Sequence, residues 1–422
     1  MKRVAIIGTG IAGLGCAHFL HPRCDLTLYE KNDYAGGHTN TVTIEEVGRP
    51  VPIDTGFMVF NKVTYPNLVK LFGELSVPVK PTDMSFSVQH LPTGLEFCGT
   101  SLNHLFAQRK NLLSPRFWRM LMQCNRFNEE AVKTLNDPDF QDCTLGEYVR
   151  QRKYGDDFLN FYLIPMSSAV WSTPPDLMLQ FPAITLLRFF HNHGFLGLHT
   201  QHPWFTVVNG SKSYVEKMIA PFRSKIQLGR PAVAVRREGQ GVQVTDASGE
   251  TNSFEQVIFA SHANETLGML KDADAQEQRV LGEFKYQQNT ALLHTDSSVM
   301  PKTRLAWSAW NYRVDFEGNG IIKPSTIYWM NRLQGVSDKQ NYFVSINGEN
   351  LIHPNSVLKR IDYEHPVFSL GAIRAQNELP GLNARMSNVY FCGSYFRYGF
   401  HEDAFTSALE LCRLLTGERL LQ

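Results

Sequence analysis

The spacing of hydrophobic residues at the start of the chain predicts a strand, a helix and a second strand. Residues 4–7 form a short uninterrupted apolar run, which is typical of a strand buried on both faces. Helical spacing follows through Leu20, and residues 26–29 form the next apolar run. This order predicts a βαβ unit and therefore a parallel sheet.

Glycines stand at the turn between the first strand and the helix. Gly8, Gly10 and Gly13 form the pattern G-x-G-x-x-G, with Ile11 and Ala12 between them. Gly8 permits the tight turn, Gly10 lets a phosphate approach the positive end of the helix, and Gly13 allows close packing of the helix on the strand. We predict that all five residues bind a dinucleotide.

An acidic residue ends the second strand at the distance that such a unit requires. Glu30 follows Gly10 by twenty residues, and Lys31 is next to it. A carboxylate at this place accepts the hydroxyls of an adenosine ribose and repels a 2′-phosphate. The residues therefore favour an ADP-containing ligand without that phosphate.

Further along the chain, the apolar pattern predicts that the same core resumes after long insertions. A Gly-Gly-His loop at 36–38 and a short strand or turn at 53–58 precede the first insertion. The later predicted elements are a hairpin at 233–244, a strand at 257–260, a helix at 264–270, a strand at 389–391 and a helix at 403–415.

Composition excludes several classes of protein. The 422 residues are 43% hydrophobic and 19% charged, which is ordinary for a globular protein of two or three domains. Lys plus Arg (41) nearly balances Asp plus Glu (40), so nucleic acid is not an expected partner. The seven cysteines are scattered without a C-x-x-C pair, which favours reduced thiols and a cytoplasmic location and offers no metal site. No apolar run is long enough for a transmembrane helix.

The order of these motifs resembles the flavin-containing amine oxidase superfamily. The matching features are the glycine fingerprint, the Gly36-Gly37 pair, Asp54-x-Gly56, the strand at 257–260 and the closing segment from Phe391-Cys-Gly to Ala404. The resemblance implies an α/β fold in which a Rossmann-like FAD-binding domain, with a parallel sheet and a β-meander, is interleaved with an α+β substrate domain. It places the FAD domain at 1–79, 205–274 and 371–422, and the substrate domain at 80–204 and 275–370.

The resemblance also implies which residues hold the FAD. Besides the five fingerprint residues, the cofactor-binding set is Glu30, Lys31, Gly36, Gly37, His38, Thr55, Gly56, Phe57, Met58, Ala232, Ser261, Gly393, Ser394, His401, Glu402 and Ala404. His401 opens the last helix. In the family, backbone N–H groups at the start of this helix face the pyrimidine edge of the flavin, where the helix N-terminus stabilises the anionic reduced form.

Stretches around Trp171, Trp329 and His401 are similar to a bacterial branch of FAD-binding oxidoreductases that often accompany fatty-acyl methyl or cyclopropane synthases and are linked with furan fatty acids. The sequence departs from amine oxidases in three places. Asn289 stands nearest to the usual lysine, Phe400 keeps an aromatic ring without a phenol, and His38 replaces an arginine after the glycine pair.

The inserted segments are rich in large apolar residues that either line a hydrophobic cavity or form ordinary core. These residues are Phe161, Tyr162, Met166, Trp171, Phe181, Phe189, Phe190, Phe195, Trp204, Trp307, Trp310, Tyr312, Tyr328 and Trp329. If residues 328–333 form a strand, as we expect, Tyr328, Met330 and Arg332 share one face and at most half of the stretch faces a ligand.

One insertion contains a helix with a basic flank. Ser114 and Pro115 are typical of a helix start, and the pattern continues to Asn136. Arg116, Arg119 and Arg126 gather beside an apolar stripe, and no acidic residue occurs from 97 to 128. Such a helix fits peripheral contact with an anionic membrane at its inner face, or a core helix with a solvated face.

A flavin supplies the redox chemistry, so the protein needs few acid or base groups. The catalytic candidates are His401, Glu402 and Tyr162, with His191 and His193 as further possible bases. The alternative for Glu402 is a purely structural role, because an acidic side chain in the first turn of a helix interacts favourably with the helix dipole.

The sequence favours hydride removal from an apolar small-molecule or lipid substrate, such as a modified fatty-acyl chain. One alternative is amine oxidation that produces hydrogen peroxide, and another is a non-redox flavin-binding protein or mutase. No second G-x-G-x-x-G is present for a nicotinamide, and no motif identifies the electron acceptor.

Overall fold

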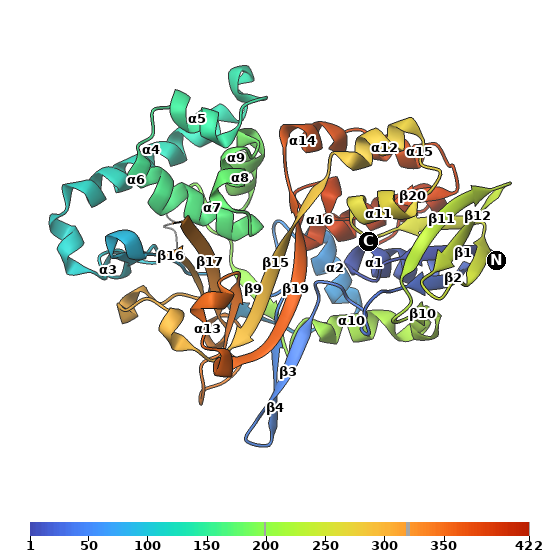
Figure 1. Ribbon diagram of the computed structural model, residues 1–422, viewed down its shortest axis with the longest axis horizontal. Helices are drawn as coiled ribbons and strands as arrows, with labels where there is room; N and C mark the ends of the chain where they lie inside the picture. Colours follow the sequence, from blue (N-terminus) through green and yellow to red (C-terminus); the bar gives the residue numbers. More distant parts are fainter. Residues whose placement is uncertain (198–199, 318–320, 422) are drawn as a thin grey trace.

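The computed structural model describes residues 1–197, 200–317 and 321–421 of the chain. Its first core is a five-stranded parallel sheet with the order β10-β2-β1-β14-β20 (Figure 1). The strands are β10 (Ile226–Gln227), β2 (Cys24–Tyr29), β1 (Lys2–Ile7), β14 (Gln256–Phe259) and β20 (Val389–Phe391). Strands from both ends of the sequence thus meet in one sheet, which confirms the predicted Rossmann-like core.

Alternate residues of β1 face the two sides of this sheet. Val4 and Ile6 pack toward α1 (Ile11–Leu20) and α16 (His401–Thr416), which lie together on one face. Ala5 and Ile7 pack on the other face toward the predicted β-meander. The meander is β11 (Ala232–Glu238), β12 (Gly241–Asp246) and β13 (Thr251–Phe254). Four helices contribute residues to the same core, namely α11 (Ala263–Met269), α12 (Ala275–Gly282), α14 (Leu370–Gln376) and α15 (Leu379–Ala384).

The second core is a seven-stranded, mainly antiparallel sheet with the order β19-β15-β18-β17-β16-β7-β8. The strands are β19 (Val357–Val367), β15 (Lys285–His294), β18 (Phe343–Ile346), β17 (Ile321–Trp329), β16 (Trp310–Glu317), β7 (Phe86–His90) and β8 (Leu95–Cys98). One expectation is wrong here. The strand ends at Trp329, and α13 (Met330–Leu333) follows, with Met330 and Leu333 both buried, so the strand alternation does not extend past Trp329.

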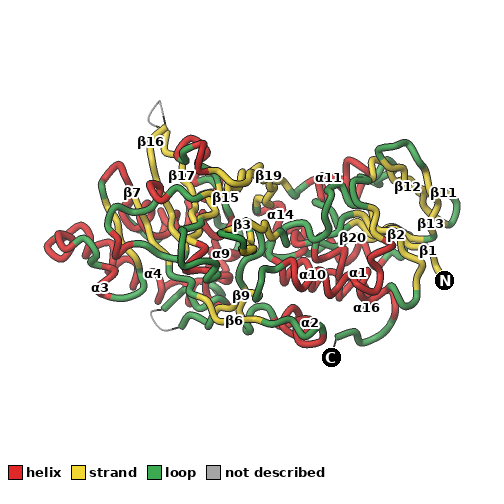
Figure 2. The backbone as a smooth tube through the Cα atoms, turned by 90° about the horizontal axis from the view of Figure 1, so that it is seen from below, coloured by secondary structure: helices red, strands yellow, loops and turns green. Residues whose placement is uncertain are grey.

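A helical insertion packs beside this sheet. Its helices are α3 (Leu102–Leu105), α4 (Pro115–Thr134), α5 (Leu145–Gln151), α6 (Asp156–Phe158), α7 (Ile164–Trp171), α8 (Pro175–Leu179) and α9 (Ala183–Asn192). As predicted, α4 begins at Pro115, and the Ser114 hydroxyl accepts a hydrogen bond from the Phe117 N–H. Figure 2 shows α3 and the N-terminus at opposite ends of the long axis.

Small elements join the two cores. They are the hairpin of β3 (Thr41–Glu46) and β4 (Arg49–Asp54), the sheet of β5 (Phe60–Asn61), β9 (Trp204–Val207) and β6 (Val79–Thr82), and helices α2 (Pro66–Glu74) and α10 (Lys212–Ile219). The buried carboxylate of Asp54 accepts the Ser211 N–H at 2.9 Å and the Gln334 amide at 2.6 Å. The hydroxyls of Thr41 and Ser211 also donate to it, and these four donors fix distant segments to each other.

The two cores draw on different parts of the sequence. The parallel sheet and the meander come only from 1–79, 205–274 and 371–422, and the seven-stranded sheet only from 80–204 and 275–370. The division into two domains with these bounds stays a prediction. Among the described helices, none has the length and hydropathy that crossing a bilayer requires.

Candidate active site

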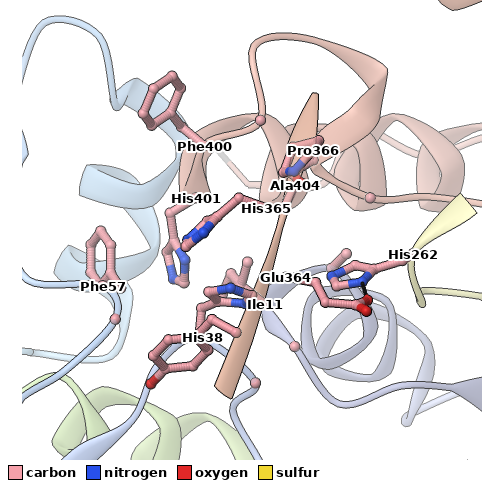
Figure 3. A pocket seen from close by; sticks show the side chains of 18 of the residues that line it. Ile11, His38, Phe57, His262, Glu364, His365, Pro366, Phe400, His401 and Ala404 are labelled. Carbon is pink, nitrogen blue, oxygen red and sulfur yellow. Dashed lines mark hydrogen bonds and ion pairs between the residues drawn. The ribbon is translucent and has the colours of Figure 1, made fainter. Parts of the chain in front are cut away.

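A cavity of about 780 Å³ runs from the carboxyl ends of β1 and β2 into the aromatic residues of the insertions. Figure 3 shows part of its lining, with His38, Phe57 and His401 among the labelled side chains. Most of the predicted cofactor-binding residues line it. They are Gly8, Gly10, Ile11, Ala12, Glu30, Lys31, Gly36, Gly37, His38, Gly56, Phe57, Met58, Ala232, Ser261, Gly393, Ser394, His401 and Ala404. The size is ordinary for a cofactor or substrate pocket.

The glycine fingerprint leaves bare backbone at the start of α1. A Cβ on Gly13 would lie 1.9 Å from the Gly8 carbonyl oxygen, so the helix can pack this closely only without a side chain. A Cβ on Gly10 would meet nothing within 4 Å, and Gly10 is the N-cap residue of α1. The helix N-terminus thus faces open space that a phosphate group can enter.

Glu30 is held rigidly at the cavity wall. One carboxylate oxygen accepts the Thr9 N–H at 3.0 Å and the Thr9 hydroxyl at 2.5 Å. The other oxygen accepts the Asn32 N–H at 2.9 Å and the Asn32 amide at 2.8 Å. These four donors use the carboxylate's lone pairs, so a ribose hydroxyl would bind Glu30 by replacing one of the side-chain donors.

His401 stands at the first residue of α16 and is held from two sides. Its Nε2 lies 2.5 Å from the Tyr214 hydroxyl, which lies 2.8 Å from the Thr39 hydroxyl. Its ring stacks on Phe57 with 3.9 Å between the ring centroids. Burial lowers the pKa of His401 to about 3, so the imidazole is neutral near pH 7.

Strand β19 contributes a wall that the sequence analysis missed, at Tyr363, Glu364, His365 and Pro366. Tyr363 stacks on His38, with 4.8 Å between centroids, and the His38 and His365 rings lie 5.4 Å apart. Burial lowers the pKa of His365 to about 4 and that of His38 well below its ordinary value. The alternation of Tyr363 and His365 along one strand is the signal that could have shown that they share a face.

Asn289 fixes the tautomer of His365. The Thr290 N–H donates to Asn347 Oδ1, so the Asn347 amide nitrogen faces Asn289 Oδ1, at 2.8 Å. The Asn289 amide nitrogen is then directed at His365 Nδ1, also at 2.8 Å. In a neutral ring that accepts at Nδ1, the proton is on Nε2. His365 is therefore a hydrogen-bond donor at the cavity wall.

We call the far part of the cavity the aromatic end. Its lining consists of Met58, Val59, Tyr65, Met84, Val170, Trp171, Ser172, Phe189, His193, Phe195, Trp204, Trp310, Tyr328 and Phe400. Phe189 stacks on Phe400 with centroids 4.8 Å apart, and burial lowers the pKa of His193 to about 4. No Asp, Glu, Lys or Arg is among these described residues. The charged residues of the lining are elsewhere, at Glu30, Lys31, Glu265, Asp362 and Glu364.

Three of the predicted cofactor-binding residues, Gly13, Thr55 and Glu402, do not line the cavity, and Gly13 instead packs α1 closely on the turn at Gly8. Thr55 lies behind it and its hydroxyl is 3.0 Å from that of Tyr363. The Glu402 carboxylate accepts the N–H groups of Asn67 and Leu68 at the start of α2, at 3.0 and 2.9 Å, which is a capping role.

The structure does not support a catalytic position for Tyr162. Its ring packs between Phe127 and Phe158 in the core of the helical insertion and not on the cavity wall. His191 is exposed and also outside the lining. Of the large apolar candidates, the cavity is lined by Trp171, Phe189, Phe195, Trp204, Trp310 and Tyr328, and the other eight do not line it.

One group of possible metal ligands lies near the cavity rim. Within the described residues, His262, Glu265 and Glu364 place ligand atoms within 4.8 Å of one another. The Lys31 ammonium already binds the Glu265 carboxylate at 2.7 Å. All three side chains are partly exposed, so this group is adequately explained as a surface ion-pair cluster.

The lining fits a large ligand with polar and apolar parts. Among the described residues, His38, Trp204, Trp310 and Tyr395 each line the cavity and have a buried polar atom without a hydrogen-bond partner. Buried polar atoms are normally paired, so unpaired ones in residues of a cavity wall are typical of a site that a ligand completes. Together with the open helix N-terminus at Gly10, they fit FAD.

Comparison with known proteins assigns the class. A model of the family described as flavin containing amine oxidoreductase matches residues 11–302. The chain belongs to this family and is an FAD-dependent oxidoreductase. No curated protein sequence matches it.

Solved structures share the fold at low sequence identity. A double mutant of putrescine oxidase has a TM-score of 0.69 and 12% identity, with 99% of each chain covered. A putative protoporphyrinogen oxidase from Exiguobacterium sp. 255-15 has a TM-score of 0.68 and 15% identity, again with 99% of each chain covered. A CLA-producing fatty acid isomerase from P. acnes has a TM-score of 0.69 and 13% identity, covering 99% of this chain and 98% of that one.

Proposed function

We propose that this flavoenzyme removes a hydride from a C–H bond of an apolar substrate, a modified fatty-acyl chain. The observation that carries the proposal is the aromatic end of the cavity, where aromatic and aliphatic side chains surround the space and no charged side chain is among the described lining residues. The histidine there, His193, is neutral because its burial lowers its pKa to about 4.

The energetics of desolvation favour an acyl chain over a charged amine. Each methylene group that leaves water for such a lining gains about 0.8 kcal/mol. A buried ammonium group without a counter-charge instead loses several kcal/mol, even after the protein relaxes. The sequence also predicts Asn289 at the place nearest to the family lysine, and its amide is used to hold His365.

The residues present assign roles around the cofactor. Bound FAD supplies the acceptor for the electron pair of the substrate. The N-terminus of α16, at His401 and Ala404, places partial positive charge at the cavity wall, and the Nε2–H of His365 offers a hydrogen bond. Phe57 fixes the plane of the His401 ring.

Desaturation also releases a proton from the carbon next to the one that loses the hydride. We assign this proton to His401, the neutral imidazole at the start of α16. A weak base is sufficient, because departure of the hydride leaves an electron-poor carbon that acidifies its neighbour. The hydroxyls of Tyr214 and Thr39 hold the ring in place from behind.

Amine oxidation is the second candidate function. It is favoured by the family to which the chain belongs and by the aromatic walls at Trp171 and Phe400, which can attract a cation through their ring faces. The structural neighbours include both putrescine oxidase and a fatty acid isomerase, so the fold does not choose between the two.

Anaerobic mixing of the FAD-loaded enzyme with candidate substrates separates these functions. Methylated or unsaturated fatty-acyl phospholipids are mixed with one sample and a panel of amines with another, and the flavin absorbance is followed. Bleaching by the lipids alone is expected. Bleaching by amines, with hydrogen peroxide and aldehyde formed after air is admitted, would establish amine oxidation. A flavin that neither class reduces would support the non-redox alternative.

A further inference from the structure

A second feature of the molecule lies outside the cavity, at the end of the long axis that carries α3 (Figures 1 and 2). Here large apolar side chains are exposed beside arginine and lysine residues. We call this surface the basic-apolar tip. Its members come from α3, the 3₁₀ turn η2 (Arg109–Leu113) and the first turns of α4, and they are Leu102, Arg109, Lys110, Leu112, Leu113, Trp118, Arg119 and Met122.

The exposure of the apolar side chains at the tip is unusually large. Leu113 is 89% exposed, Leu102 75% and Met122 65%. Trp118 and Met122 stand one helical turn apart, so they share a face of α4 with Arg119. Exposed apolar residues scattered singly are normal, but a group of them on adjacent elements indicates an interaction surface.

Contacts within the tip hold its three segments together. The Trp118 indole donates to the Leu112 carbonyl at 2.9 Å, and its ring lies 5.2 Å from that of Phe106. The Arg109 guanidinium donates to the Asn103 side chain at 2.6 Å. The exposed side chains are therefore displayed from an ordered scaffold.

Charge decides which partner this surface fits. No Asp or Glu occurs between residues 97 and 128. Arg116 is paired with Asp157 and Arg126 with Glu130, whereas Lys110 and Arg119 have no ion pair within the part of the chain that the structure describes. Apolar side chains that enter the acyl region, flanked by cations that remain at the headgroups, are the two signals that reversible membrane binding requires.

We propose that the basic-apolar tip docks on the surface of an anionic lipid bilayer. Leu102, Leu113 and Met122 enter the interface, and Lys110 and Arg119 bind lipid phosphates. A protein partner or a second copy of the chain would instead be expected to match the cations with acidic groups of its own.

An apolar layer separates the tip from the cavity. Phe117 and Met120, on the inner side of α4, pack in a cluster that Phe86 joins, and Phe86 lies 5.3 Å from Trp310 in the lining of the aromatic end. Docking would thus bring the aromatic end close to the source of acyl chains. This use of docking rests on the proposed function, whereas the docking itself does not.

Sedimentation of the full-length FAD-loaded protein with vesicles tests the proposal. The vesicles contain phosphatidylcholine alone or phosphatidylcholine with phosphatidylglycerol. We expect binding to the anionic vesicles that weakens as salt is added, and about fivefold weaker binding for Arg119→Glu or Lys110→Glu. Leu113→Glu should weaken binding at least as much.

Helix α4 supplies its own matched controls. Val132 and Lys133 are exposed near its other end, so Val132→Glu and Lys133→Glu change one apolar and one cationic residue away from the tip. Both variants should bind anionic vesicles like the unmodified protein. Flavin absorbance shows that each variant is loaded and folded.

The proposal fails if the protein does not bind anionic vesicles, or if the tip variants and the control variants weaken binding equally. It also fails if the tip variants alter only the oligomeric state, which would make the tip a contact between copies. If the protein binds the vesicles but lipids do not reduce the flavin, the result supports docking and counts against the proposed function alone.

Discussion

The Asn289 amide nitrogen lies 2.8 Å from Nδ1 of His365, across two neighbouring strands of the seven-stranded sheet. The chain therefore uses Asn289, which we predicted to lie nearest to the usual lysine of the family, to orient a neutral histidine. The bond from Asn347 to Asn289 fixes the direction of the amide, and this direction keeps a proton on His365 Nε2.

Removing this bond should slow flavin reduction without releasing FAD. Asn289→Leu leaves His365 free to turn or to change tautomer. A buried hydrogen bond contributes about 1.4 kcal/mol, so its loss should lower the rate constant of flavin reduction about tenfold. Stopped-flow absorbance measures the rate. Asn252→Leu, on strand β13 of the meander, is the control.

Asn289→Asp should change the pH profile instead. A carboxylate beside His365 stabilises the imidazolium and raises its pKa from the present value of about 4 toward neutrality. Flavin reduction should then acquire a titration between pH 5 and 7 that the unmodified enzyme lacks. An unchanged profile in Asn289→Asp would show that His365 does not contact the reacting groups.

Substitutions at two glycines of the fingerprint should distinguish an effect on cofactor binding from an effect on folding. A methyl group at Gly10 meets no protein atom within 4 Å, so Gly10→Ala should fold normally and lose at least tenfold in FAD affinity. A methyl group at Gly13 would lie 1.9 Å from the Gly8 carbonyl oxygen, so Gly13→Ala should lose both FAD and stability. Gly73→Ala, in open space on α2, is the control. Calorimetry and FAD titration measure the two properties.

A charge placed in the aromatic end should reverse the substrate preference. Ser172 lines that end and has a left-handed backbone with φ of 51°, which Asp and Asn tolerate. Ser172→Asp should bind amines roughly tenfold more tightly, about 1.4 kcal/mol, and bind acyl chains more weakly. Ser172→Asn, of equal size without charge, should change neither. If both variants behave alike, the missing counter-charge does not determine specificity.

The buried histidines should make the FAD-free protein sensitive to acid. The pKa of His193 is lowered by burial to about 4 in the folded chain, against about 6.5 in the unfolded chain. Between these values the unfolded state binds more protons, so stability is complete above pH 6.5 and falls as the pH drops toward 4.

His193→Gln should therefore flatten the loss of stability below pH 6.5. One histidine accounts for at most about 1.4 kcal/mol per pH unit of the slope. Urea unfolding at several pH values measures it, with His191→Gln on the exposed side of α9 as the control. A slope that stays the same in His193→Gln would mean that His193 titrates alike in both states.

Local patterns predicted the parts of the fold that depend on local sequence. The apolar run that became β1, the glycines before α1 and Glu30 at the end of β2 lie within thirty residues, where strand and helix periods are unambiguous. Ser114 and Pro115 marked the start of α4 for the same reason.

Local patterns could not predict which residues the pairing of distant strands brings together. Asn289 and His365 are joined because β15 pairs with β19, and no local signal in either strand specifies that register. Tyr162 has the composition of a cavity residue, yet its neighbours Phe127 and Phe158 enclose it in the core. Aromatic residues stabilise a core and a cavity wall through the same chemistry, so only the packing separates the two.

The most direct measurement of the central claim is the mass of the acyl chain after one anaerobic turnover with stoichiometric FAD-loaded enzyme. We predict that one acyl chain loses two hydrogens for each flavin that is reduced, and that the same protein freed of FAD leaves the lipid unchanged. An unchanged acyl chain beside a flavin that amines reduce would contradict it.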